Sequence, residues 1–125
     1  MEVKLVLAAA ALALAAPALA AAQPIAKGTF GPTAKYTGKG TATAVRVGAG
    51  RELRLSRDFV AMNAIKLRLY LATSPSASTR VDLGPMKPRG AQRFRLPARV
   101  NLGRYRYVIA WCVAVNAPIT QATLR

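Results

Sequence analysis

The clearest pattern in the chain is an alternation of apolar and polar positions that is typical of half-buried β-strands. Residues 65–71 read Ile-Lys-Leu-Arg-Leu-Tyr-Leu. Because side chains two residues apart share one face of a strand, the four aliphatic residues should lie on a buried face. Lys66, Arg68 and Tyr70 should then face outward.

Two neighbouring runs predict a β-hairpin. Residues 41–47 are rich in threonine and valine. Residues 51–56 alternate, which places Leu53 and Leu55 on one face of the strand and Arg54 on the other. The intervening Gly48-Ala-Gly50 supplies residues suited to a turn.

A longer apolar run indicates a central strand. Residues 105–115 begin with alternating side chains and then become apolar on both faces, which is typical of the middle of a sandwich. Further extended pieces are predicted at residues 81–85, 93–97 and 119–124.

Glycine and proline separate these runs. Residues 23–40 contain four glycines and two prolines and predict a loop-rich entry segment, and residues 72–79 predict a polar loop. Helical periodicity of useful length is confined to the N-terminus. The pattern therefore predicts one all-β domain, an antiparallel β-sandwich or barrel of about seven to nine short strands.

The N-terminus has the features of a cleaved signal peptide over residues 1–22. A lysine-bearing start precedes an apolar run at 5–16, and small residues at 18–20 and 20–22 offer cleavage sites. The run is shorter than the ~20 residues a spanning helix needs. We expect residues 23–125 to form a periplasmic or secreted domain without a transmembrane segment. The alternative is an N-terminus that stays uncleaved as an anchor.

The chain is strongly basic, with a formal net charge of +15. Because Glu2 and Lys4 cancel, cleavage would leave this charge on the folded domain. Such a surface attracts polyanions, so an acidic redox partner protein or an envelope polyanion is a candidate partner. Arginine-rich coding in a GC-rich genome is the simpler explanation. No recognised nucleic-acid motif is present, and Trp111 and its neighbouring tyrosines suit core packing, so no specific nucleic-acid partner is expected.

The chain contains no histidine and only one cysteine, Cys112. Blue-copper sites, most catalytic zinc sites and Ser-His-Asp or Cys-His nucleophiles are therefore excluded. After cleavage the acids are Glu52, Asp58 and Asp82. The first two stand among arginines, where ion pairing is the ordinary role, so a hydrolytic carboxylate pair is not favoured.

Cys112 is the candidate functional residue. An odd cysteine in an exported protein suggests a free thiol, a disulfide-linked dimer or a sulfur ligand, whereas the simpler alternative is a small buried apolar residue. If the strand is regular, Cys112 shares a face with Val108 and Ala110 and points away from Trp111. Arg106 would lie on the same face, where its charge would favour a thiolate.

Short motifs spread over residues 28–124 resemble the DM-thirteen domain, an electron-transfer domain of Skeletor-type and bacterial exported proteins. The matching pieces are Gly28-Thr-Phe30, Gly40-Thr-Ala42, Arg51-Glu-Leu-Arg-Leu55 with Asp58-Phe59, Leu67-Arg-Leu-Tyr-Leu71, Val81-Asp-Leu-Gly-Pro85, Phe94-Arg-Leu-Pro97 and Tyr107-Val-Ile-Ala-Trp-Cys112.

The resemblance implies a β-rich domain whose cysteine, here Cys112, is the redox centre, either as a bare thiol or as the thiolate ligand of a group such as haem. Two segments depart from the family pattern. Residues 63–66 replace its usual turn, and Lys35-Tyr36 stands where many members have a histidine.

Two functions remain open at this stage. The first is an exported redox or electron-transfer domain centred on Cys112. The alternative is a non-enzymatic cationic binding module that docks an acidic envelope component or partner protein.

Overall fold

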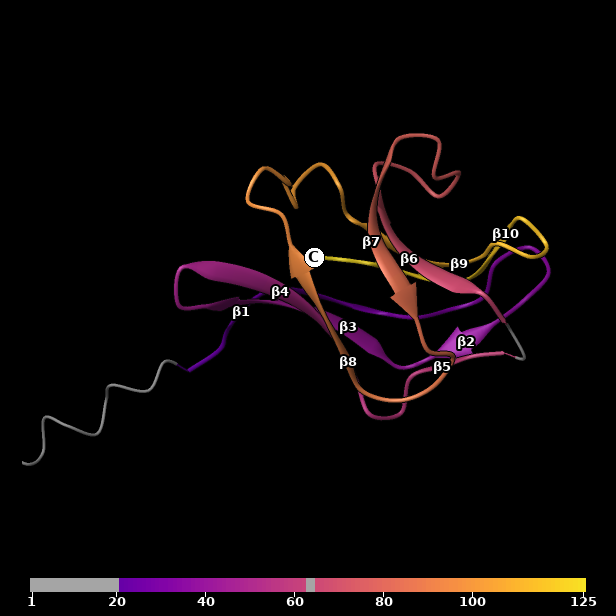
Figure 1. The fold of residues 1–125 in the computed structure, drawn as a ribbon, viewed down its shortest axis with the longest axis horizontal. Coiled ribbons are helices and arrows are strands. Elements are labelled where there is room, and N and C mark those ends of the chain that lie inside the picture. Colours follow the sequence, from indigo (N-terminus) through magenta and orange to yellow (C-terminus); the bar gives the residue numbers. More distant parts are fainter. Residues whose placement is uncertain (1–20, 63–64) are drawn as a thin grey trace, which may run out of the picture.

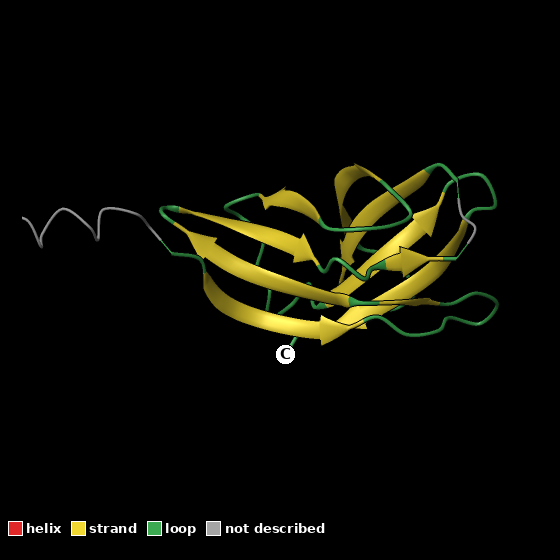
Figure 2. Cartoon of the chain, turned by 90° about the horizontal axis from the view of Figure 1, so that it is seen from below, coloured by secondary structure: helices red, strands yellow, loops and turns green. Residues whose placement is uncertain are grey.

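A computed structural model describes residues 21–62 and 65–125 of the chain. Within these residues the secondary structure is entirely strand, turn and loop (Figures 1 and 2). The strands are β1 (Gln23–Thr29), β2 (Gly38–Lys39), β3 (Thr41–Val47), β4 (Gly50–Leu55), β5 (Val60–Ala61), β6 (Leu67–Ala72), β7 (Arg80–Met86), β8 (Gln92–Leu96), β9 (Tyr107–Cys112) and β10 (Ala117–Thr123).

In the described part of the chain the strands form two four-stranded antiparallel sheets and one small pair. The first sheet has the order β1-β3-β4-β8, the second has the order β10-β9-β6-β7, and β2 pairs with β5. The two larger sheets lie over one another as a sandwich (Figure 2). This confirms the predicted all-β antiparallel class.

The β3–β4 hairpin forms as the alternation predicted. Ala42 pairs with Leu55 and Ala44 with Leu53, and the hairpin turns after Val47. Gly48 there has a φ of 59°, a conformation that glycine adopts without the steric cost of a Cβ.

The main core lies between the two sheets. Both contribute alternate side chains, and the sandwich is filled without any disulfide, since Cys112 is a free cysteine. Its fully buried large members include Leu53, Phe59, Leu69, Leu71, Val108, Ile119 and Leu124.

One side of the sandwich is closed where β1 meets β10. Lys27 and Arg125 exchange backbone hydrogen bonds of 3.2 and 3.0 Å, and Gly31 pairs with Gln121. Gly28 permits this approach, because a Cβ there would meet the backbone carbonyl of Thr123. The loop-rich interpretation of residues 23–40 was therefore wrong for 23–29, since pairing with β3 and β10 overrides the local glycines and prolines.

Strand β6 differs from its predicted pattern at both ends. Leu67, Leu69 and Leu71 are buried as expected, but Ile65 precedes the strand and is 67% exposed. Tyr70 lies on the outer face as expected, but it is buried there, because residues 73–79 fold over this face and bring Ala77 against it.

This outer face holds a second, smaller core. Tyr70 and Trp111 pack with ring centroids 5.8 Å apart, and the guanidinium of Arg80 lies 4.5 Å from the centroid of the Tyr70 ring. Trp111 is thus a packing residue, as expected, but it packs outside the sandwich rather than inside it.

No helix among the described residues has the length and apolar character required to cross a bilayer. The predicted signal peptide at 1–22 lies almost wholly outside the described residues, as do positions 63 and 64 of the segment that departs from the family pattern.

Candidate functional site

Cys112 is the last residue of β9, a central strand of its sheet. Leu67 of β6 lies opposite it on one side and Ala117 of β10 on the other. Val108, Ala110 and Cys112 all belong to the core between the sheets, whereas Ile109 belongs to the outer cluster against which Trp111 packs. The predicted orientation of Cys112 is confirmed.

The thiol is covered but lies close to the surface. Cys112 is 3% exposed, and its Sγ donates a hydrogen bond to the backbone carbonyl of Ile65 at 3.0 Å. The backbone N–H of Val113 donates to the carbonyl of Lys66 at 3.0 Å. These two bonds join the end of β9 to the segment that precedes β6.

A cavity of about 350 Å³ opens directly beside the sulfur. Tyr36, Met62, Ile65, Cys112, Ala114, Val115 and Ile119 line it. Its lining is mainly apolar, so a group that enters it exchanges water for hydrocarbon contacts.

Three of the lining side chains are large, apolar and exposed. Ile65 is 67% exposed, Val115 53% and Met62 42%. We call these three residues the apolar rim. Among the described residues, Ile25 on β1 and Val113 are the remaining large hydrophobic residues with comparable exposure, and neither lines this cavity. An exposed apolar group of this kind marks a contact surface more often than a single exposed side chain does.

A model of the family described as Electron transfer DM13 matches residues 29–124. The chain belongs to the electron transfer DM13 family. Searches of curated proteins and of solved structures returned no match. The match includes every strand from β2 to β10 and the whole surroundings of Cys112.

The arginine expected to favour the thiolate lies elsewhere in this DM13 domain. Arg106 is exposed and precedes β9, six residues from Cys112. At about 3.3 Å per residue, the two are some 20 Å apart along the strand. The expectation failed because sharing a face of a strand does not bring two residues together when they occupy its opposite ends.

The surroundings of the sulfur do not suit a haem ligand. The described lining carries no basic side chain to pair with haem propionates. The Cys112–Ile65 hydrogen bond of 3.0 Å would have to break before a thiolate could bind iron, but it would also have to break before a thiolate could attack a disulfide. The lack of cations in the described lining is therefore what favours a bare thiol over a haem ligand.

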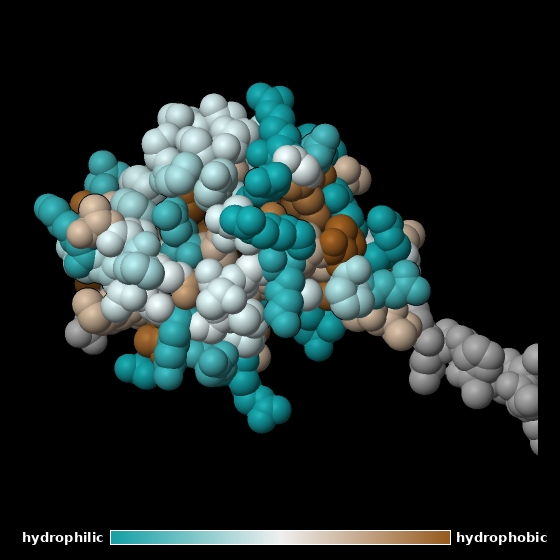
Figure 3. Space-filling view, turned by 180° about the vertical axis from the view of Figure 1, so that it is seen from behind, coloured by the Kyte–Doolittle hydropathy of each residue, from teal (hydrophilic) through white to brown (hydrophobic). Residues whose placement is uncertain are grey.

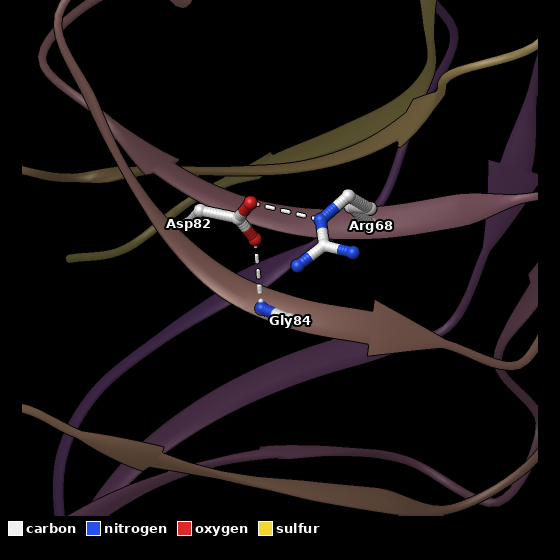
Figure 4. Close-up of polar contacts among 3 residues, drawn as sticks. All are labelled: Arg68, Asp82 and Gly84. Carbon is white, nitrogen blue, oxygen red and sulfur yellow. Dashed lines mark hydrogen bonds and ion pairs between the residues drawn. The ribbon is translucent and has the colours of Figure 1, made fainter.

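Each of the three carboxylates among the described residues interacts with its own partners. Glu52 pairs with Arg54 at 3.1 Å, and Asp58 accepts a hydrogen bond of 2.6 Å from Ser56. Asp82 accepts from Arg68 and from the Gly84 backbone, each at 2.8 Å (Figure 4). Asp82 thereby stabilises the irregularity where β7 gains a residue relative to β6. Glu52 thus forms the ion pair expected from the sequence, whereas Asp58 accepts its hydrogen bond from a serine hydroxyl.

Sequence reasoning located Cys112 but missed the apolar rim. It extended the core strand to Val115, whereas β9 ends at Cys112 and residues 113–116 form the turn to β10. Asn116, with a φ of 51°, was the available signal, since asparagine tolerates the left-handed conformation that such turns use.

Proposed function

We propose that this DM13 domain transfers electrons through Cys112 as a bare thiol, and that a partner docks on the apolar rim. The observation that carries the proposal is the position of the only cysteine beside an apolar cavity, whose rim holds three of the five large exposed hydrophobic residues in the described part of the chain. Membership of an electron transfer family supports the same assignment.

The reaction is thiol–disulfide exchange with a partner that carries a disulfide. The Cys112 thiolate attacks one partner sulfur, so a mixed disulfide forms while the partner's own S–S bond breaks and the second sulfur leaves as a thiolate. A dithiol reductant then attacks the partner sulfur of the mixed disulfide, and Cys112 leaves with the bonding electron pair and regains its proton. The second thiolate of the reductant resolves the new mixed disulfide between reductant and partner. The partner ends as a dithiol and the reductant as a disulfide, so two electrons pass from the reductant to the partner.

Docking has a defined task in this scheme. Cys112 is 3% exposed and its hydrogen atom is directed at the Ile65 carbonyl. A partner that packs against Ile65 and Met62 can displace this carbonyl from the sulfur. The site would then be selective for disulfides presented by a protein or peptide with an apolar flank.

The first test is mixed-disulfide formation by the folded protein. The mature domain is incubated with oxidised glutathione and with an apolar peptide disulfide, and intact mass is followed in time. We expect a single adduct that Cys112→Ser abolishes, and a faster rate with the peptide. Adduct formation that requires denaturant would overturn the proposal. A visible absorption band lost in Cys112→Ser would replace the bare thiol with a bound cofactor.

A matched pair of variants tests the docking surface. Ile65→Ala removes an exposed side chain from the apolar rim, whereas Ile25→Ala removes one of the same type from β1. We expect Ile65→Ala to reduce the preference for the peptide disulfide and Ile25→Ala to leave it unchanged. Equal effects would show that the rim does not select the partner.

The proposal places the domain outside the cytoplasm, where disulfide-bearing partners are common. Expression of the full chain with its N-terminus, followed by fractionation and N-terminal sequencing, tests this. A mature chain that begins near Gln23 in the periplasm or medium is the expected result. An intact cytoplasmic chain would contradict it.

A further inference from the structure

The outer face of the β1-β3-β4-β8 sheet carries a row of cations across its strands. Lys27 of β1 lies opposite Thr43 of β3, Thr43 opposite Arg54 of β4, and Arg54 opposite Arg93 of β8. Neighbouring strands are about 4.8 Å apart, so the row spans roughly 15 Å. We call Lys27, Arg54, Arg93 and Arg95 the cationic row.

The positive charge of this row is only partly compensated within the described structure. Arg95 lies opposite Glu52, whose carboxylate is 3.1 Å from Arg54. Lys27, Arg93 and Arg95 are exposed and form no ion pair with any described residue. One carboxylate therefore serves four cations on one face of a sheet.

Arg54 and Arg93 lie directly opposite each other on neighbouring strands, and an anionic ligand between them would relieve the repulsion of their charges. Like charges directly opposite each other on antiparallel strands destabilise the pairing. These two side chains line a surface hollow of about 370 Å³ together with Gln92. A carboxylate in this hollow would accept hydrogen bonds from both guanidiniums, whose planar donor sets match its two oxygens.

The neighbouring residues indicate which kind of anion fits. Hydroxyl groups of Thr29, Thr41 and Thr43 lie on the outer faces of β1 and β3, beside Lys27. Among the strands of this sheet, the one large exposed hydrophobic residue in the described structure is Ile25 on the edge strand β1, and Phe94 of β8 is turned into the core. The face thus offers cations and hydroxyls without the apolar centre of a protein interface or the aromatic platforms that stack on bases.

We propose that this face binds a linear acidic polysaccharide built from uronic acid units. A carboxylate of the chain lies between Arg54 and Arg93, a second pairs with Lys27 or Arg95, and the threonines bind sugar hydroxyls. This site lies on the sheet opposite Cys112 and is independent of its chemistry. Seen from behind, the molecule presents hydrophilic side chains around smaller hydrophobic areas (Figure 3). We expect the arrangement of the cationic row, rather than charge alone, to determine the specificity.

The test measures binding of the full mature protein to polygalacturonate at about 0.15 M salt, where charges more than about 8 Å apart are largely screened. Arg54→Gln with Arg93→Gln is compared with Arg99→Gln and Arg106→Gln, which removes the same charge from exposed positions elsewhere. We expect the first pair to weaken binding at least about tenfold, as the loss of charged hydrogen bonds predicts, and the second less than about twofold.

Three results would overturn the proposal. Equal losses in both double variants would show that overall charge suffices. Absence of binding to polygalacturonate would exclude the polysaccharide, and stronger, Arg54- and Arg93-dependent binding to phosphatidylglycerol vesicles would make the occupant a lipid surface. Thermal melts of both variants verify folding, and Arg54→Lys with Arg93→Lys, which keeps the charge, should restore binding only in part.

Discussion

Arg51 of β4 binds the loop that follows β8 through hydrogen bonds to backbone carbonyls. It belongs to no ion pair in the described structure, but we expect its removal to destabilise the domain. Its Nη2 donates to the carbonyls of Pro97, Ala98 and Val100 at 2.9, 3.2 and 2.8 Å. Val100 is 4% exposed, so the loop that follows β8 is held with its valine in the core.

The magnitude follows from these bonds. A hydrogen bond to a charged group contributes about 1.5–3 kcal/mol when it is buried. Here one nitrogen serves three carbonyls and the side chain is only half-buried, so water would recover part of the loss. We therefore expect Arg51→Ala to lower the free energy of unfolding by about 2 kcal/mol, which corresponds to a fall in Tm of about 8–16 °C for a domain of this size.

Thermal unfolding followed by circular dichroism measures this effect, with Arg95→Ala as the control. Arg95 is exposed on the adjacent strand and donates no hydrogen bond to any described residue. Its removal should change stability by less than about 0.5 kcal/mol. If the two variants melt together, the loop is not held by the Arg51 guanidinium and the reasoning fails.

Three further changes test the fold. Gly28→Ala should cost about 1–3 kcal/mol in urea unfolding, because the new methyl group meets the Thr123 carbonyl, whereas Gly31→Ala has open space and should cost much less. Asp82→Asn should lower stability by about 1 kcal/mol, since it removes the charge that pairs with Arg68; no change in the urea midpoint would show that this pair contributes nothing. Raising NaCl from low to physiological concentration should increase Tm, because a net charge of +15 repels itself more than the described ion pairs attract; a fall in Tm would contradict this.

The class of fold could be predicted from the sequence because each strand carries its own period of two. The alternation of β6 indicates which of its residues are buried, namely Leu67, Leu69 and Leu71. The glycines after β3 indicate the position of the hairpin turn. The first strand could not be read in this way. Gln23–Thr29 is mainly exposed, so its pairing with β3 and β10 leaves little hydrophobic pattern in its own residues.

The site could be predicted only as far as one residue determines it. The uniqueness and strand position of Cys112 were visible in the sequence, and its orientation followed from the period of two. The apolar rim depends on where β9 ends and on which segments meet there, and Met62 and Val115 become neighbours of the same cavity only through tertiary pairing. The cationic row likewise depends on register, since Lys27 and Arg93 are far apart in sequence.

Each four-stranded sheet has one edge outside the contact between β1 and β10. These edges are β8 in the first sheet and β7 in the second. An open edge strand can add a strand from another molecule and so begin aggregation. Here β8 presents Arg93 and Arg95 at its edge, and β7 contains Pro85, which lacks an N–H, next to an irregularity at Asp82. Strand addition from a second molecule is therefore disfavoured at both edges. We expect the domain to resist aggregation through its sheet edges at high concentration, although it has no disulfide bond.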